Sequence, residues 1–273
     1  MQKRVLSTFE KGKTAMFACQ YDPRFSYCAY IPSDWNWDDE PLTMIVVVHG
    51  SARTPQQYRD CFSEYAEKNR LIVLAPLFPC AITSFDDMSS YKYVSYGGIR
   101  FDNVLLAMVD EMGRRYNAKT DRFLMHGFSG GGHFVHRFFY LHPERLLGVS
   151  IGAPGYITVL DDNKPWHAGT KGFEQVFGTN IDLARLRSVP VQLIVGSEDT
   201  DPSDINEKGG NWMDELAETG TNRMERIRYL YENYQSKGLN VHLDIVPGVK
   251  HWGYSVVPDV CTFFDTVLSS MNN

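Results

Sequence analysis

The sequence predicts an α/β fold in which a mostly parallel sheet is flanked by helices. Short apolar segments rich in β-branched residues recur along the chain, and several of them carry no polar residue. Such segments are typical of strands buried on both faces of a parallel sheet. Segments with helical periodicity separate most of them. The length of 273 residues suits one large α/β domain, and no internal repeat or low-complexity linker divides the chain.

About eight strands are expected. In chain order they cover residues 15–21, 27–31, 44–48, 71–75, 123–125, 147–151, 191–195 and 241–246. The first two lie close together along the chain, so we expect them to form an antiparallel edge. The later strands alternate with helices, which predicts right-handed crossovers between parallel strands.

Four helices are expected between and after these strands. The first covers 54–66, with Thr54 as its N-cap and Pro55 as its first residue. Apolar residues repeat with helical spacing over the other three, residues 101–116, 224–234 and 260–271.

Two segments, 153–189 and 200–221, lack clear periodicity. Loops of this length inside a compact domain usually carry function or are disordered. We expect residues 153–189 to form a small lid or cap insertion over the active site. The alternative is a structural flap whose rings pack outside the sheet. Trp166 and Trp212 lie in these segments and Trp252 lies near the C-terminus, and all three are predicted to bind substrate unless they are plain core residues.

Composition narrows the class of partner. The net charge of −6 gives no electrostatic basis for nucleic-acid binding, and no basic patch or membrane-length apolar segment is present. The N-terminal segment contains no apolar run typical of a secretory signal. Five scattered cysteines without a C-x-x-C pair are read as reduced thiols. We therefore expect a cytoplasmic protein that acts on a small molecule, and its oligomeric state is not predicted.

The segment MHGFSGGG, residues 125–132, follows an apolar strand and contains G-x-S-x-G as Gly127, Ser129 and Gly131. This pattern is typical of a sharp strand-to-helix turn that exposes a serine hydroxyl. Ser129 is therefore the candidate nucleophile.

A serine hydroxyl needs a base, and the base needs an orienting carboxylate. Asp199 follows the strand 191–195, and Glu198 and Asp201 are rival acids that the strand register favours less. His251 follows the strand 241–246 and a Pro-Gly turn. All three candidates lie just beyond the carboxyl ends of strands, where open α/β sheets bind their ligands.

The oxyanion of an acyl-transfer intermediate needs hydrogen-bond donors. The strand 44–48 ends in His49-Gly50-Ser51, so the amide of Ser51 or Ala52 is one candidate donor. The amide of Gly130 is the other, and His49 is expected to brace this loop.

No metal or cofactor is expected. His133 and His136 lie three residues apart on the helix that the strand-to-helix turn at Ser129 implies, but no carboxylate or cysteine has a fitting spacing. His126 lies inside a predicted strand and is expected to be a packed core residue.

The segments VVVHGS, GFSGGG, LIVGSEDTD and VPGVKHWG, in this order, resemble those of α/β-hydrolases. The chain is most similar to the esterase and poly-hydroxyalkanoate-depolymerase-like branch over roughly residues 40–270. The resemblance implies a single α/β-hydrolase domain in which Ser129 is the nucleophile, Asp199 the acid and His251 the general base.

The predicted function is a serine hydrolase that cleaves a small to medium ester, thioester or lactone through an acyl-enzyme. Two alternatives remain open. The same triad can support carbon–carbon bond hydrolysis, peptide cleavage or lyase chemistry, and the same fold can act as a non-catalytic ligand receptor.

Overall fold

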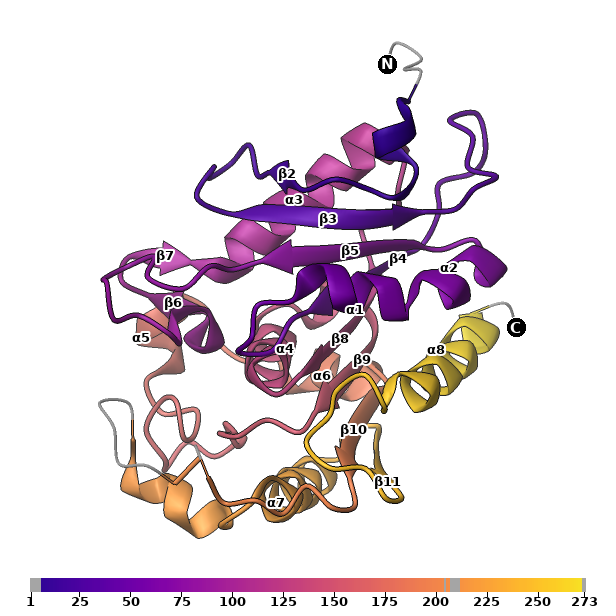
Figure 1. Ribbon diagram of the computed structural model, residues 1–273. Coiled ribbons are helices and arrows are strands. Elements are labelled where there is room, and N and C mark those ends of the chain that lie inside the picture. The colour runs from indigo at the N-terminus through magenta and orange to yellow at the C-terminus, as the bar shows by residue number, and fades with distance from the viewer. Residues whose placement is uncertain (1–5, 204, 207–211, 272–273) are drawn as a thin grey trace. The chain divides into compact units, whose positions relative to one another are not determined.

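The structure is a computed structural model that describes residues 6–203, 205–206 and 212–271. Its contacts divide the chain into two compact units, residues 1–125 and 126–273. Figure 1 shows the elements of each unit, and the two units are described in turn. The prediction that they make up a single domain stays a prediction.

The strands of the first unit form an antiparallel edge that continues into a parallel pair. Strand β3 is antiparallel to β1, β2 and β5, whereas β4 and β5 are parallel. The expected strand at 15–21 is reduced to two residues in β2, which pair with Tyr27 and Ser26. The strands are β1 (Gly12–Lys13), β2 (Phe17–Ala18), β3 (Ser26–Ile31), β4 (Met44–Val48) and β5 (Ile72–Leu77).

The helices of the first unit pack against these strands. The expected helix over 54–66 is divided at Phe62, where the Ser63 hydroxyl donates to the Asp60 carbonyl at 2.7 Å. A side chain that takes a backbone carbonyl in this way competes with the helix. The elements are η1 (Thr8–Glu10), α1 (Pro55–Cys61), α2 (Ser63–Asn69), η2 (Ser90–Tyr93), the hairpin of β6 (Ser95–Tyr96) and β7 (Ile99–Arg100), and α3 (Phe101–Tyr116).

In the second unit β9, β10 and β11 run parallel, and β8 enters this unit at His126. Strand β9 pairs with β10 in the register Val191 to Val149, and β10 pairs with β11 in the register Val191 to Val241. Every residue of β8, β9 and β10 is buried, which explains their apolar sequences. The strands are β8 (Phe123–Phe128), β9 (Leu146–Gly152), β10 (Val191–Gly196) and β11 (Val241–Val246).

The helices of the second unit follow its strands. Helix α4 packs on β9, α7 packs on β10 and β11, and α8 packs on β9 and β10. The segment 153–189 contains two short helices, α5 and α6. The helices are α4 (Gly130–Leu141), η3 (Pro143–Arg145), α5 (Phe173–Phe177), α6 (Leu183–Ser188), η4 (Asp214–Thr219), α7 (Arg223–Ser236) and α8 (Val257–Met271).

A row of polar side chains crosses the strands of the second unit. His126 Nδ1 lies 3.0 Å from Ser150 Oγ, Ser150 donates to Gln192 Oε1 at 2.6 Å, and Gln192 donates to Asp244 Oδ2 at 2.6 Å. His126 is fully buried, so it is the core residue that the sequence predicts. Hydrogen bonds between neighbouring strands fix their register, because a one-residue slip would break each bond of the row.

The predicted fold class is therefore confirmed as a mostly parallel sheet with helices against it. The five cysteines are free thiols, as expected. Burial raises the pKa of Cys28 to about 11 and that of Cys261 to about 12, so neither supplies a thiolate near neutral pH. Within the described part of the chain, no helix is long and apolar enough to cross a membrane.

Candidate active site

Ser129 lies at the sharp turn between β8 and α4. Its backbone has φ 57° and ψ −117°, a left-handed conformation that L side chains rarely adopt. Two hydrogen bonds hold the turn, because the Ser129 amide donates to Gly152 O at 2.8 Å and the His133 amide donates to Ser129 O at 3.0 Å. The serine is thus presented at the carboxyl end of a buried strand.

Gly132 lets the helix after Ser129 approach β9. A Cβ atom at Gly132 would lie well inside van der Waals contact with the carbonyl oxygen of Gly152. No other residue fits this distance without moving the helix away from the strand. The glycines around Ser129 therefore serve close packing as well as the turn.

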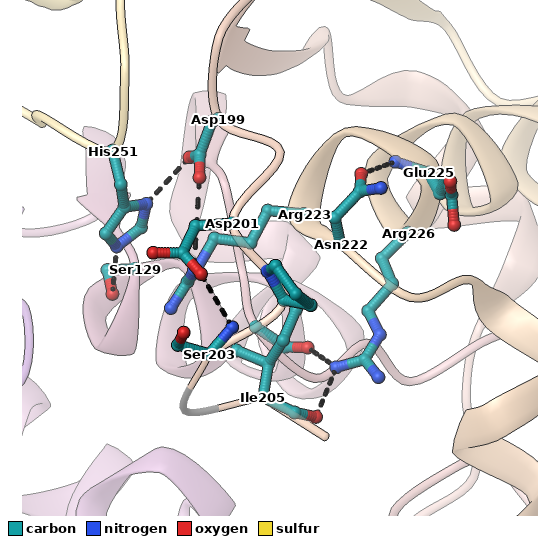
Figure 2. Close-up of polar contacts among 12 residues, drawn as sticks. Ser129, Asp199, Asp201, Ser203, Ile205, Asn222, Arg223, Glu225, Arg226 and His251 are labelled. Carbon is teal, nitrogen blue, oxygen red and sulfur yellow. Dashed lines mark hydrogen bonds and ion pairs between the residues drawn. The ribbon is translucent and has the colours of Figure 1, made fainter. Parts of the chain in front are cut away.

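His251 lies between Ser129 and Asp199 (Figure 2). His251 Nε2 is 2.9 Å from Ser129 Oγ, and His251 Nδ1 is 2.7 Å from Asp199 Oδ2. Asp199 follows β10, and His251 follows the neighbouring parallel strand β11. The carboxyl ends of neighbouring parallel strands meet at one edge of the sheet, and this brings together residues that are 52 positions apart.

The partners of His251 determine where its proton resides. A carboxylate oxygen only accepts hydrogen bonds, so His251 Nδ1 carries the proton that Asp199 accepts. Nε2 of the neutral ring then accepts from the Ser129 hydroxyl. This is the tautomer that a general base for serine requires.

The rival acids differ from Asp199 in their exposure and in their hydrogen-bond partners. Asp199 is 1 % exposed, whereas Glu198 and Asp201 are exposed. Asp201 Oδ1 accepts the Ser203 amide at 2.9 Å. Hydrogen bonds from Ser203 lower the pKa of Asp201, and the nearby charges of Arg223 and His251 add to that effect.

Gly130 and Ser51, whose amides are the predicted oxyanion donors, lie in different units. Gly130 is buried and is the first residue of α4, where amide groups have no acceptor within the helix. Ser51 is an exposed turn residue after β4, and its carbonyl accepts from Arg53 Nη1 at 2.6 Å. The pairing of these two amides in one oxyanion hole stays a prediction.

His49 joins the loop after β4 to the chain beyond β5. Its Nδ1 lies 2.8 Å from Gly50 O, and its Nε2 accepts the Phe78 amide at 3.0 Å. Burial lowers the pKa of His49 to about 4, so the ring stays neutral and keeps its acceptor nitrogen at neutral pH. This geometry fits the bracing role expected for His49.

His133 and His136 face the segment that follows β9. His133 Nε2 accepts the Tyr156 amide at 3.1 Å, and His136 Nε2 accepts the Thr158 amide at 3.0 Å. Each ring uses a nitrogen that would otherwise be a metal ligand. Among the residues that the structure describes, no group of three or more His, Cys, Asp or Glu side chains could hold a metal ion.

The three tryptophans lie in different surroundings. The Trp166 ring packs on Phe173 and Phe177, with centroids 5.4 and 5.0 Å away. The half-buried Trp212 meets the ring of Tyr156 at 6.1 Å. Trp252 follows His251 and is 60 % exposed. Substrate binding by any of them stays a prediction.

Tyr156 connects Trp212 to the helix of the nucleophile. The Tyr156 ring lies 5.7 Å from the ring of His133, which is one helical turn beyond Ser129. Trp166 instead meets α4 at Arg137, eight residues beyond Ser129, with 5.8 Å between the guanidinium carbon and the ring centroid. Helical rise over eight residues is about 12 Å, so Trp212 is connected to α4 closer to Ser129 than Trp166 is.

Sequence reasoning missed two arginines at the start of α7. Arg223 Nη1 lies 3.9 Å from Asp199 Oδ1. Arg226 is fully buried and donates to the carbonyls of Gly155 and Ile205. The sequence carries one signal for them, since helix N-termini favour acidic side chains and disfavour basic ones.

Comparison with solved structures identifies the fold. The chain is similar to poly(aspartic acid) hydrolase-1 from Sphingomonas sp. KT-1, with TM-score 0.74, 21 % identity, and 93 % of this chain and 98 % of that chain covered. It is also similar to the poly(3-hydroxybutyrate) depolymerase LpqC from Bordetella parapertussis, with TM-score 0.70, 22 % identity, and coverage of 88 % and 83 %. An S-formylglutathione hydrolase from Agrobacterium tumefaciens matches with TM-score 0.60, 16 % identity, and coverage of 89 % and 88 %.

The chain therefore has the α/β-hydrolase fold that the sequence predicts. No protein-family model matches the chain, and no curated protein sequence matches it.

Proposed function

We propose that the protein is a serine hydrolase that cleaves a small to medium ester, thioester or lactone through an acyl-enzyme. The observation that carries the proposal is the continuous row of hydrogen bonds from Ser129 through His251 to the buried Asp199. A solvated carboxylate would orient the imidazole weakly, whereas Asp199 is 1 % exposed.

In acylation, Ser129 Oγ attacks the carbonyl carbon of the substrate. His251 Nε2 takes the hydroxyl proton as the new bond forms, and Asp199 stabilises the resulting imidazolium through Nδ1. The tetrahedral intermediate collapses when His251 returns this proton to the leaving group. Water then repeats the sequence against the acyl-enzyme and regenerates the Ser129 hydroxyl.

The charge that develops on the substrate oxygen needs donors that are already in place. We assign the Gly130 amide as one donor, because it directly follows the nucleophile and begins α4. Ser51 is the proposed second donor. Neither a metal nor a cofactor has a step in this mechanism.

The names of the similar structures guide the choice of substrates to test. By name, two of these act on polymers, poly(aspartic acid) and poly(3-hydroxybutyrate), and a third acts on S-formylglutathione. A substrate panel should therefore include short aryl esters, a thioester, a lactone, oligomers of 3-hydroxybutyrate and oligomers of aspartate. Turnover of the aspartate oligomers alone would favour the peptidase alternative.

The test uses a fluorophosphonate, which labels serines activated by a base. We expect the purified protein to be labelled at Ser129 and to hydrolyse a short-chain aryl ester. Ser129→Ala should lose both properties while its thermal unfolding stays cooperative. A variant that keeps more than a few per cent of the activity would exclude Ser129 as the nucleophile. A wild-type protein that is neither labelled nor active on the panel would favour the receptor alternative.

A further inference from the structure

A buried arginine lies behind the acid of the proposed triad. Arg223 Nη1 is 3.9 Å from Asp199 Oδ1, and the two side chains are 9 % and 0 % exposed. The other oxygen, Oδ2, is the one that His251 contacts. Figure 2 shows the row that results, from Ser129 through His251 and Asp199 to Arg223.

The Asp199 carboxylate needs a counter-charge. An ionised carboxylate without hydrogen bonds or a cation is strongly disfavoured in a protein interior. Oδ1 is buried and accepts no hydrogen bond from the residues that the structure describes. Arg223 is the cation that faces this oxygen.

Arg223 is the first residue of α7, a position where basic side chains are disfavoured. The N-terminus of a helix carries partial positive charge, which repels an arginine there. The Asp199 carboxylate offsets this repulsion. Side chains that break a local preference in this way are expected at functional sites.

The start of α7 is anchored, so the position of Arg223 is well defined. Asn222 Oδ1 accepts the Glu225 amide at 2.9 Å and caps the helix. One turn further on, Arg226 donates to Ile205 O at 2.9 Å and to Gly155 O. These bonds fasten α7 to the loop after Asp199 and to the segment after β9.

We propose that Arg223 is a positioning residue of the triad, whose guanidinium faces Oδ1 of Asp199 and keeps the carboxylate turned so that Oδ2 faces His251. This inference rests on the proposed hydrolase function. Arg223 acts through Asp199 and not on the reacting atoms. Its positive charge also offsets part of the attraction between Asp199 and a protonated His251, so loss of that charge should favour the protonated ring.

Other titratable groups lie on the elements that carry this row. Lys250 and Glu198 are exposed and lie on the loops of His251 and Asp199, and Asp201 is exposed beside Arg223. His133 on α4 accepts the Tyr156 amide through Nε2. Exposed charges are largely screened by salt, so measurement at about 0.15 M ionic strength or above isolates the buried pair.

The experiment compares Arg223→Met, Arg223→Lys and Arg228→Met. Arg228 is an exposed residue of the same helix, so its replacement makes the same change in net charge. For a neutral aryl ester we expect Arg223→Met to lower kcat about tenfold, to leave KM nearly unchanged and to move the midpoint of the kcat/KM pH profile upward. Arg223→Lys should return the midpoint of this profile most of the way to the wild-type pH. Arg228→Met should match the wild type in kcat, KM and midpoint.

A second measurement does not depend on turnover. The imidazole resonances of His251 are followed by NMR during a pH titration of the wild type and of Arg223→Met, with a His251→Asn variant for assignment. We expect the titration of His251 to move to higher pH in Arg223→Met. An unchanged titration in folded Arg223→Met, or an equal change in Arg228→Met, would overturn the role of Arg223. The absence of fluorophosphonate labelling in the wild type would instead overturn the proposed function.

Discussion

Gly196 lies directly against the carbonyl oxygen of Val249. A Cβ atom on Gly196 would fall well inside van der Waals contact with that oxygen and with the carbonyl of Lys250. Gly196 ends β10 and Val249 follows β11, so this contact joins the loop of Asp199 to the loop of His251. The Glu198 amide donates to Val249 O at 2.8 Å and closes the same junction.

Gly196→Ala is therefore expected to damage the site from a distance. The methyl group must push the two loops apart, and a displacement of about 1 Å at a catalytic group can lower the rate about a hundredfold. Ester hydrolysis and thermal unfolding would be measured together. Gly178→Ala is the control, because a Cβ there meets no atom within 4 Å although φ is +71°. We expect the control to lose some stability and to keep its turnover, and equal activity in both variants would contradict the steric argument.

The strain at Ser129 predicts an effect on stability. A non-glycine residue at φ 57° and ψ −117° costs about 1–3 kcal/mol. Ser129→Gly removes the Cβ atom, whereas Ser129→Ala keeps it. We expect both variants to be inactive and the glycine variant to be more stable than the alanine variant by about 1 kcal/mol, because the chain entropy of glycine offsets part of the relief. Chemical denaturation measures the difference, and a less stable glycine variant would show that the turn is not strained.

The choice between the two aspartates is tested by amide variants. Asp199→Asn should lower kcat by several orders of magnitude, because an amide next to Nδ1 favours the wrong tautomer of His251. Asp201→Asn should change kcat less than about threefold, since an exposed charge is weakened by solvent. Steady-state kinetics on one ester compares them. A larger loss in the Asp201 variant would transfer the role of the acid to that residue.

Much of the fold could be predicted because its strands are buried on both faces. β4 appears in the sequence as an uninterrupted apolar run and β10 as a run that is apolar apart from Gln192, and the structure places them at 44–48 and 191–196. The prediction of a single helix over 54–66 was wrong. Two helices meet at Phe62, where the Ser63 hydroxyl donates to the Asp60 carbonyl. The periodic pattern of apolar residues does not reveal local hydrogen bonds of this kind.

The site residues could be predicted from the sequence only where a sequence motif marks them. Ser129 has a glycine-rich surrounding, and Asp199 and His251 follow apolar strands. Arg223 has no such signal apart from its place at a helix N-terminus, because its partner Asp199 is 24 residues away in sequence. Contacts between a helix and a loop depend on tertiary packing, which the pattern of one chain does not reveal.

Buried histidines predict acid sensitivity. Burial lowers the pKa of His49 and of His126 to about 4 and that of His167 to about 3, and it places the pKa of His136 well below its ordinary value. Between about pH 6.5 and pH 4 the unfolded chain therefore binds protons that the folded chain does not, so the free energy of unfolding falls as pH falls. Each histidine contributes up to about 1.4 kcal/mol per pH unit.

Urea unfolding at pH 7.5 and at pH 5 measures this loss of stability. His126→Asn keeps a polar partner for Ser150 Oγ and cannot titrate. We expect this variant to lose less stability than the wild type over the same interval, even if it is less stable at pH 7.5. An equal loss in both proteins would show that other groups cause the acid sensitivity.

Trp212 and Trp166 allow substrate contact to be separated from structural packing. Trp212 is half-buried, meets the Tyr156 ring at 6.1 Å, and is connected through that ring to His133, one turn beyond Ser129. Trp166 packs on Phe173 and Phe177 of its own segment.

Aromatic pairs contribute about 0.5–1.5 kcal/mol each beyond burial, so Trp166→Ala should lower the melting temperature clearly. Trp212→Ala loses one such pair and not two, so we expect it to lower the melting temperature less than Trp166→Ala and to change the ranking of acyl chain lengths by kcat/KM. Melting curves and a series of aryl esters from acetate to octanoate measure both effects. If Trp166→Ala changes the ranking while its melting temperature stays constant, residues 153–189 act as a lid and the structural reading of Trp166 is wrong.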